Sequence, residues 1–165
     1  MGGYGRGELH PYSDVDLLVL LPNKNKRDVR EPVSAFLALL WDIGLQVGHS
    51  TRTVDECRDE SRRDLTTATT LMEGRRLLGP EELFRRMEAA CAPPDVWPAR
   101  SCFEAKLKEQ QARHGRYDDT AYNLEPNVKA SPGGLRDIQT IGWVAKRHFG
   151  AETLDELVDH GFLTA

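Results

Sequence analysis

Two acidic residues, Asp14 and Asp16, stand at the start of the longest apolar run of the chain, Val15 to Leu21. Side chains alternate between the two faces of a strand, so both carboxylates would point the same way while Val15 points into the core. Adjacent carboxylates repel each other unless a cation lies between them, and oxygen ligands suit Mg²⁺, especially where nucleotide phosphates complete its shell. The pattern predicts that Asp14 and Asp16 bind Mg²⁺.

A glycine-rich stretch lies directly upstream of the acid pair and contains Gly2, Gly3, Gly5 and Gly7. Glycines let backbone N–H groups approach phosphate oxygens closely, and Arg6 adds a fixed positive charge beside them. We expect Gly2, Gly3 and Arg6 to bind a nucleotide, together with Ser13 directly before the acids. Phosphate-binding residues next to a metal-binding acid pair are the minimum apparatus for phosphoryl or nucleotidyl transfer.

The elements that must position these residues can be read from the hydrophobic pattern and the turn residues. Strands are predicted over 14–21 and 45–52, separated by a helix over 28–43. Thr53 and Glu56 form a capping box that begins another helix. The segment 64–72 is open between helix and strand, because Asp64 can cap a helix but LTTATT is rich in β-branched residues.

The second half of the sequence predicts helices. One begins at Pro80, a long polar helix runs near 98–115, and an amphipathic helix covers 135–149. Its expected apolar face consists of Leu135, Ile138, Ile141, Val144 and Ala145. Between the last two helices, the segment 121–134 contains the Pro and Gly residues of a loop. Gly133 and Gly134 precede a helix, so free N–H groups there could face an anion, and Lys129 could reach a triphosphate. A plain loop is an equally good interpretation.

Composition limits the classes of protein to consider. The chain has 165 residues, enough for one domain with a core, and a formal charge of −4, which argues against a strongly basic nucleic-acid binder. No apolar run approaches the roughly 20 residues that a membrane helix needs. Three cysteines without a CxxC spacing favour neither a disulfide framework nor a zinc site, so we expect a cytoplasmic protein without nucleic-acid or membrane partners.

The glycine-rich stretch and the acid pair described above carry a family resemblance. The pattern GG–x10–DVD resembles the DNA polymerase β-like nucleotidyltransferase superfamily, and GGYGRGELHPYSDVDLLVLLP resembles the bacterial PII uridylyltransferase/uridylyl-removing enzymes. Supporting strings occur along nearly the whole chain: GHSTRT, LMEGRRLLG and NLEPNVKASPGGLRDIQTIGWVAKRHFG. The resemblance implies an α/β fold of the polymerase β-like kind, with a small mixed sheet and flanking helices, followed by a helical extension. We expect the core over 1–79 and the extension over 80–165.

The resemblance also implies an activity: Mg²⁺-dependent transfer of UMP from UTP to a tyrosine of the nitrogen-signalling protein PII. Members of this family also carry HD and ACT domains, whose motifs we do not find in these 165 residues. The superfamily usually has a third acid, for which Glu73 is our candidate and Asp64, a possible helix cap, the runner-up. Because the glycine-rich stretch begins without an element before it, we expect a truncated chain that is inactive alone.

Two alternatives stay open at this point. One is an enzyme of the same fold with another protein acceptor, such as the adenylyltransferase that acts on glutamine synthetase, because the residues do not distinguish UTP from ATP. The other is a non-catalytic nucleotide-binding or interaction module, against which the intact pair Asp14 and Asp16 argues.

Overall fold

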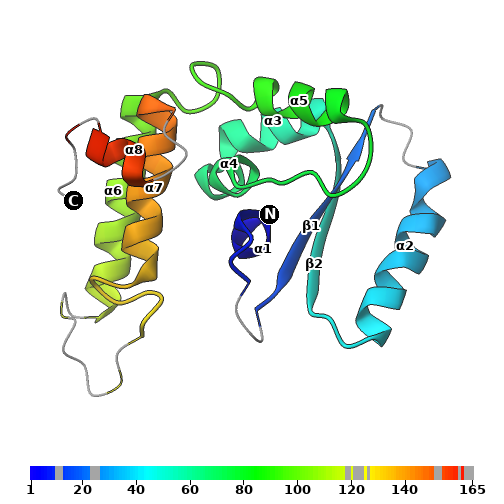
Figure 1. The fold of residues 1–165 in the computed structure, drawn as a ribbon, viewed down its shortest axis with the longest axis horizontal. Helices are drawn as coiled ribbons and strands as arrows, with labels where there is room; N and C mark the ends of the chain where they lie inside the picture. Colours follow the sequence, from blue (N-terminus) through cyan, green and yellow to red (C-terminus); the bar gives the residue numbers. More distant parts are fainter. Residues whose placement is uncertain are drawn as a thin grey trace. The chain divides into compact units, whose positions relative to one another are not determined.

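The computed structural model describes residues 1–9, 13–22, 27–117, 120, 125, 127–150, 154–159 and 161. They divide into two compact units, Met1–Val96 and Trp97–Ala165 (Figure 1). The first unit contains α1 (Gly2–Arg6), β1 (Val15–Leu21), α2 (Arg27–Asp42), β2 (Val47–Thr53), α3 (Val54–Arg63), α4 (Leu65–Met72) and α5 (Glu81–Ala90). The second contains α6 (Ala99–His114), the 3₁₀ turn η1 (Gly115–Tyr117), α7 (Leu135–Phe149) and α8 (Leu154–Asp159).

The sheet of the first unit consists of β1 and β2, which pair in parallel with Asp16 opposite Gly48 and Leu20 opposite Arg52. Parallel neighbours require a crossover connection, which α2 supplies. In Figure 1, α2 lies on one side of the strand pair, and α3, α4 and α5 lie on the other. The predicted small sheet with flanking helices is confirmed, and its two described strands run parallel.

Local capping explains why helices begin directly after β2. The Thr53 hydroxyl accepts the Glu56 N–H and the Glu56 carboxylate accepts the Thr53 N–H, which is the predicted capping box of α3. The segment 64–72, for which the sequence allowed either a helix or a strand, is helical. Asp64 accepts the N–H groups of Thr66 and Thr67, and α4 follows. The cap and the burial of the apolar side of α4 outweigh the β-branched residues.

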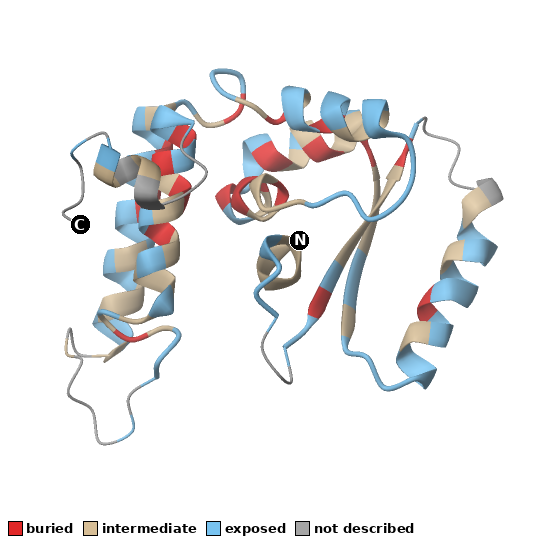
Figure 2. Cartoon of the chain, in the orientation of Figure 1, coloured by how far each residue is buried: buried red, intermediate tan, exposed pale blue. Residues whose placement is uncertain are grey.

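The core of the first unit is a cluster of four buried residues, Cys57, Leu71, Met87 and Cys91. Leu18 and Leu20 of β1 pack against it. Figure 2 shows buried residues on the facing sides of α3, α4 and α5. Since α5 and its C-cap supply Met87 and Cys91, the first compact unit extends to residue 96. The boundary between core and extension at 79/80 stays a prediction.

The second unit is built on the packing of α6 against α7. Lys106 is almost fully buried, with its ammonium 4.4 Å from the centre of the Trp143 ring and 2.8 Å from Glu109. The predicted helix over 135–149 is confirmed, but its buried residues are Thr140, Trp143, Ala145 and Arg147. Three of the residues expected to share the apolar face are exposed: Leu135, Ile138 and Ile141. None of the helices in the described part of the chain is long and apolar enough to cross a membrane.

The Asp64 cap gives a first prediction. Its carboxylate accepts bonds from Thr66 N, Thr67 N and the Thr67 hydroxyl, so Asp64→Ala should lower the free energy of unfolding by about 1 kcal/mol. Burial tends to raise the pKa of Asp64, but these hydrogen bonds outweigh it and hold the pKa below its usual value. A depressed pKa stabilises the fold above the unfolded value of about 3.9, and this contribution is lost as the pH falls through the folded pKa.

Urea unfolding of both forms between pH 7 and pH 2 checks this prediction. The two curves should lie apart at neutral pH and converge in acid. Asp59→Ala is the matched control, because the ion pair of Asp59 with Arg58 is exposed and its loss should change stability little. An Asp64→Ala chain as stable as wild type at pH 7 would contradict the role of the cap.

Candidate active site

The acid pair lies at the start of β1. Asp14 precedes the strand and Asp16 is its second residue, and both are exposed, whereas Val15 between them is buried with 8% of its surface accessible. The alternation of a strand therefore holds at these three residues, with Val15 on the face opposite to the two carboxylates. Ser13 is exposed directly before the pair. Its role in nucleotide binding stays a prediction.

Two glycines leave room around the Asp16 carboxylate. A Cβ added at Gly2 would lie 3.4 Å from Asp16 Oδ2, and one added at Gly48 would lie 2.8 Å from Asp16 Oδ1. Gly48 is the β2 neighbour of Asp16, and any side chain there would displace the carboxylate. Gly2 of α1 thus borders Asp16, so the glycine-rich stretch and the acid pair form one site.

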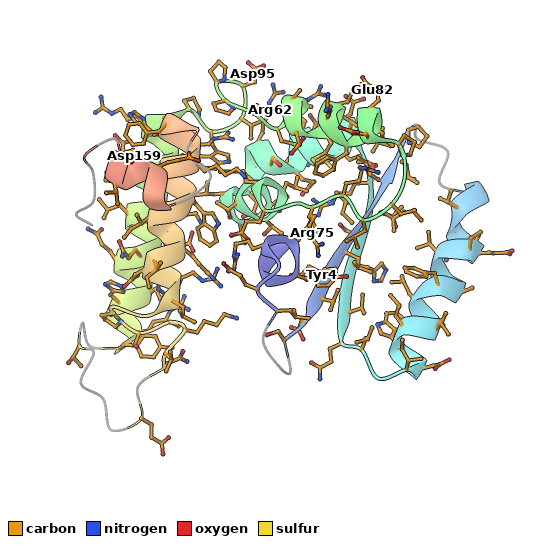
Figure 3. All side chains as sticks on the ribbon, in the orientation of Figure 1. Tyr4, Arg62, Arg75, Glu82, Asp95 and Asp159 are labelled. Atoms are coloured by element: carbon orange, nitrogen blue, oxygen red, sulfur yellow. The ribbon has the colours of Figure 1, made fainter. Side chains whose placement is uncertain are left out.

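The segment Glu73–Arg75, which follows α4, holds α1 in place. A Cβ on Gly5 would lie 1.9 Å from the carbonyl oxygen of Glu73, an approach that only glycine permits. The Arg6 guanidinium lies 2.6 Å from the Glu73 carboxylate. Arg75 donates a 3.1 Å hydrogen bond to the Tyr4 carbonyl, and its guanidinium lies 5.3 Å from the centre of the Tyr4 ring. Both residues are labelled beside α1 in Figure 3.

Charge around Arg6 is balanced by two carboxylates. Besides Glu73, Glu8 lies 2.8 Å from Arg6 Nε. Burial tends to lower the pKa of Arg6, but the bonds and charges of Glu8 and Glu73 outweigh it and raise that pKa. Arg6 is therefore a fixed cation on the short helix whose Gly2 borders Asp16, and Glu73 orients it.

A pocket adjoins Asp16 along β1. It has a volume of about 390 Å³ and is lined by the apolar residues of β1, by Phe36 of α2 and by residues 74–80. Most of this surface is hydrocarbon.

Comparison with known proteins agrees with this geometry. A model of the nucleotidyltransferase domain matches residues 1–72, and one of the GlnD PII-uridylyltransferase matches residues 101–165. The chain is 58% identical over 163 residues to the bifunctional uridylyltransferase/uridylyl-removing enzyme of Ectopseudomonas mendocina. It is 57% identical over 164 residues to that of Stutzerimonas stutzeri, and 59% identical over 163 residues to that of Pseudomonas aeruginosa. This chain belongs to the GlnD PII-uridylyltransferase family.

The matches cover 99% of the chain but only 18% of each of these relatives, so the chain spans less than a fifth of their length. No solved structure matches it significantly. The nucleotidyltransferase match over the first unit confirms the predicted fold class. The site at Asp16 therefore lies in the part of the chain that matches the nucleotidyltransferase domain.

Glu73, the predicted third acid of this GlnD-family chain, lies near α1 with its carboxylate on Arg6. Among the described residues, no group of three His, Cys, Asp or Glu side chains lies close enough together to hold a metal. Asp14, Asp16 and Glu73 therefore do not form a three-carboxylate cluster here. The runner-up, Asp64, is the cap of α4. The catalytic role of Glu73 stays a prediction, whereas its contact with Arg6 is a feature of the structure.

The interpretation of Gly133 and Gly134 as an anion-binding turn is contradicted. Asp137 accepts the Gly133 N–H at 2.8 Å, and the N–H groups of Gly134, Leu135 and Arg136 all donate to backbone carbonyls of the preceding loop. Asp137 is itself bound by Gln110, Arg113 and His114 of α6. The helix N-terminus is thus occupied from within the chain. Lys129 lies in the same loop, and its contact with a nucleotide stays a prediction.

Sequence reasoning missed Gly48 and Arg75. A glycine inside a strand often marks a close approach of another group, which could have pointed to Gly48 opposite the acid pair. Nothing in the local pattern connects Arg75 with Tyr4, because the two residues are 71 positions apart. The string LMEGRRLLG, used here for the family resemblance, was the signal that the segment matters.

Proposed function

We propose that this chain is the nucleotidyltransferase part of an enzyme that transfers UMP from UTP to a tyrosine of the PII signalling protein, in nitrogen and glutamine sensing. The observation that carries this proposal is the Asp16 carboxylate, which is exposed and bordered by Gly2 and Gly48 in a chain of the GlnD family. The relative from Ectopseudomonas mendocina is a bifunctional uridylyltransferase/uridylyl-removing enzyme. A cytoplasmic location and the absence of nucleic-acid and membrane partners are part of the proposal.

The residues of the site fit Mg²⁺. Asp14 and Asp16 offer carboxylate oxygens on the exposed side of β1, and the glycines beside Asp16 leave space for a cation and its remaining oxygen ligands. Two protein carboxylates with phosphates completing the shell is the usual way in which proteins hold this ion. When bound, Mg²⁺ supplies charge neutralisation at the transferring phosphate.

The chain's own residues would bind and orient the nucleotide. Arg6 places a guanidinium near the phosphates, and its ion pairs with Glu8 and Glu73 restrict where that charge points. Gly2 and Gly3 allow the backbone of α1 to approach a phosphate oxygen. Orientation of this kind matters, because a displacement of about 1 Å can cost roughly 100-fold in rate. We propose no residue for recognition of the base.

A label-transfer assay tests the proposal. The 165-residue chain, and the same chain extended to the length of the relatives, would be incubated with PII, Mg²⁺ and UTP or ATP labelled at the α-phosphate. We expect the extended chain to label PII from UTP, to lose this activity in EDTA, and to spare PII whose target tyrosine is replaced by phenylalanine. Labelling from ATP would favour the same-fold adenylyltransferase, and no labelling from either nucleotide would favour a non-catalytic module.

A further inference from the structure

A small pocket lies between β2 and α4. Its volume is about 120 Å³, and Met1 and Leu71 are its apolar lining residues. Its polar lining consists of Ser50, Arg52, Thr66, Thr67 and Thr70. A water molecule takes about 30 Å³ in the liquid, so the pocket has room for a group the size of a few waters. That is the scale of a phosphate group rather than of a whole nucleotide.

Arg52 gives this pocket a positive charge. It is half-buried, and within the described part of the chain no hydrogen bond or ion pair to its side chain is found. Other arginines of the unit differ: Arg6, Arg58 and Arg63 each pair with a carboxylate. A half-buried guanidinium has lost part of its hydration without a protein partner to compensate, which favours an anion at this position.

The α4 side of the pocket is rigid. Asp64 accepts the backbone N–H groups of Thr66 and Thr67 and the Thr67 hydroxyl, and Thr70 donates to the Thr66 carbonyl at 2.8 Å. Asp64 is thereby held on its own helix rather than on Arg52. The hydroxyls of Thr67 and Thr70 are thus engaged within α4, while Ser50 adds a hydroxyl from β2.

The pocket lies on the same face of the sheet as the acid pair. Residues that pair in a parallel sheet share a face, so Asp16 and its neighbour Gly48 lie on the face of Ser50 and Arg52. The Asp16 carboxylate reaches over β2 at Gly48. At about 3.3 Å per residue, Ser50 and Arg52 follow about 7 and 13 Å farther along the strand. The long arginine side chain can reach back along part of that distance.

We propose that Arg52 and Ser50 of β2, beside α4, form an anion subsite that binds the phosphate tail of the nucleotide held at Asp14 and Asp16. This rests on the proposed function and adds the residues that would bind the far end of the phosphate chain. Arginine suits this task, because its planar guanidinium donates two parallel hydrogen bonds to phosphate oxygens. The subsite would distinguish a triphosphate from a nucleoside without reading the base.

Binding rather than turnover is the direct test. Calorimetric titrations with UTP, inorganic tripolyphosphate and uridine, in the presence of Mg²⁺, would compare wild type with Arg52→Gln in the extended chain. We expect Arg52→Gln to weaken UTP and tripolyphosphate about 10-fold to 100-fold, since hydrogen bonds to charged groups are worth about 1.5–3 kcal/mol. Uridine affinity should not change. Arg52→Lys should restore part of the loss, because it returns the charge but not the paired donors.

Controls separate the subsite from folding and from the proposed function. Arg63→Gln removes an exposed arginine of the same unit and should leave every affinity unchanged. If Arg52→Gln lowers the unfolding temperature sharply, Ser50→Ala takes its place, with an expected loss of about threefold to tenfold in tripolyphosphate affinity. Equal tripolyphosphate affinity in wild type and variants would overturn the subsite while leaving the proposed function intact. A wild type that binds neither UTP nor tripolyphosphate would overturn both.

Discussion

Asp16→Asn should abolish uridylyl transfer while leaving the fold intact. The substitution keeps the size of the side chain but removes the charge that would bind Mg²⁺ beside Asp14. A metal ion supplies several kcal/mol of transition-state stabilisation, and each 1.4 kcal/mol is tenfold in rate, so we expect a loss of about 10³-fold or more. The label-transfer assay with UTP and PII measures it.

Asp16→Asn should leave the free energy of unfolding unchanged or raise it. Asp14 and Asp16 are exposed like charges, so neutralising one of them in the absence of metal relieves repulsion and exposes nothing. Urea unfolding without Mg²⁺ should therefore give a midpoint for Asp16→Asn that is equal to wild type or higher. Near-normal transfer by Asp16→Asn would reject the assignment of the acid pair. A large fall in stability would show that the carboxylate has a structural role instead.

The features that the sequence predicted well are those decided by neighbours in the chain. The Thr53–Glu56 capping box needs only a spacing of three residues, and the common exposure of Asp14 and Asp16 follows from strand alternation. Asp64 resolved the ambiguity of 64–72 through the same local chemistry. In each case the partners are so close in sequence that tertiary structure can change little.

The features that it missed depend on contacts between distant segments. Periodicity found α7, but not the side that packs, because Trp143 contacts Lys106 of α6. Gly133 suggested an anion site because its partner, Asp137, was not recognisable as a cap of that turn. Likewise, Glu73 was a candidate ligand by its type, and only the folded chain shows its carboxylate on Arg6. Residue type alone cannot distinguish a metal ligand from a residue that orients a cation.

Gly5→Ala should impair both folding and transfer, and it tests whether the Glu73–Arg75 segment positions α1. In an ordinary helix this substitution would stabilise by about 0.5–1 kcal/mol, because alanine loses less backbone entropy than glycine. Here the new Cβ would lie 1.9 Å from the Glu73 carbonyl oxygen, which is backbone and cannot rotate away. We expect a net loss of about 1–3 kcal/mol in the free energy of unfolding, the usual cost of overpacking.

Gly142→Ala is the matched control, since Gly142 also lies within a helix and nothing lies within 4 Å of its added Cβ. It should leave stability unchanged or raise it slightly. The displacement at Gly5 should also move Gly2 and Arg6, which share its short helix, so transfer should fall by roughly 100-fold if the shift is about 1 Å. The loss should persist at temperatures where urea titration shows the variant fully folded. A folded Gly5→Ala chain with wild-type transfer would show that α1 can move from Glu73 without cost to the site, and that its contacts with Glu73 and Arg75 serve stability alone.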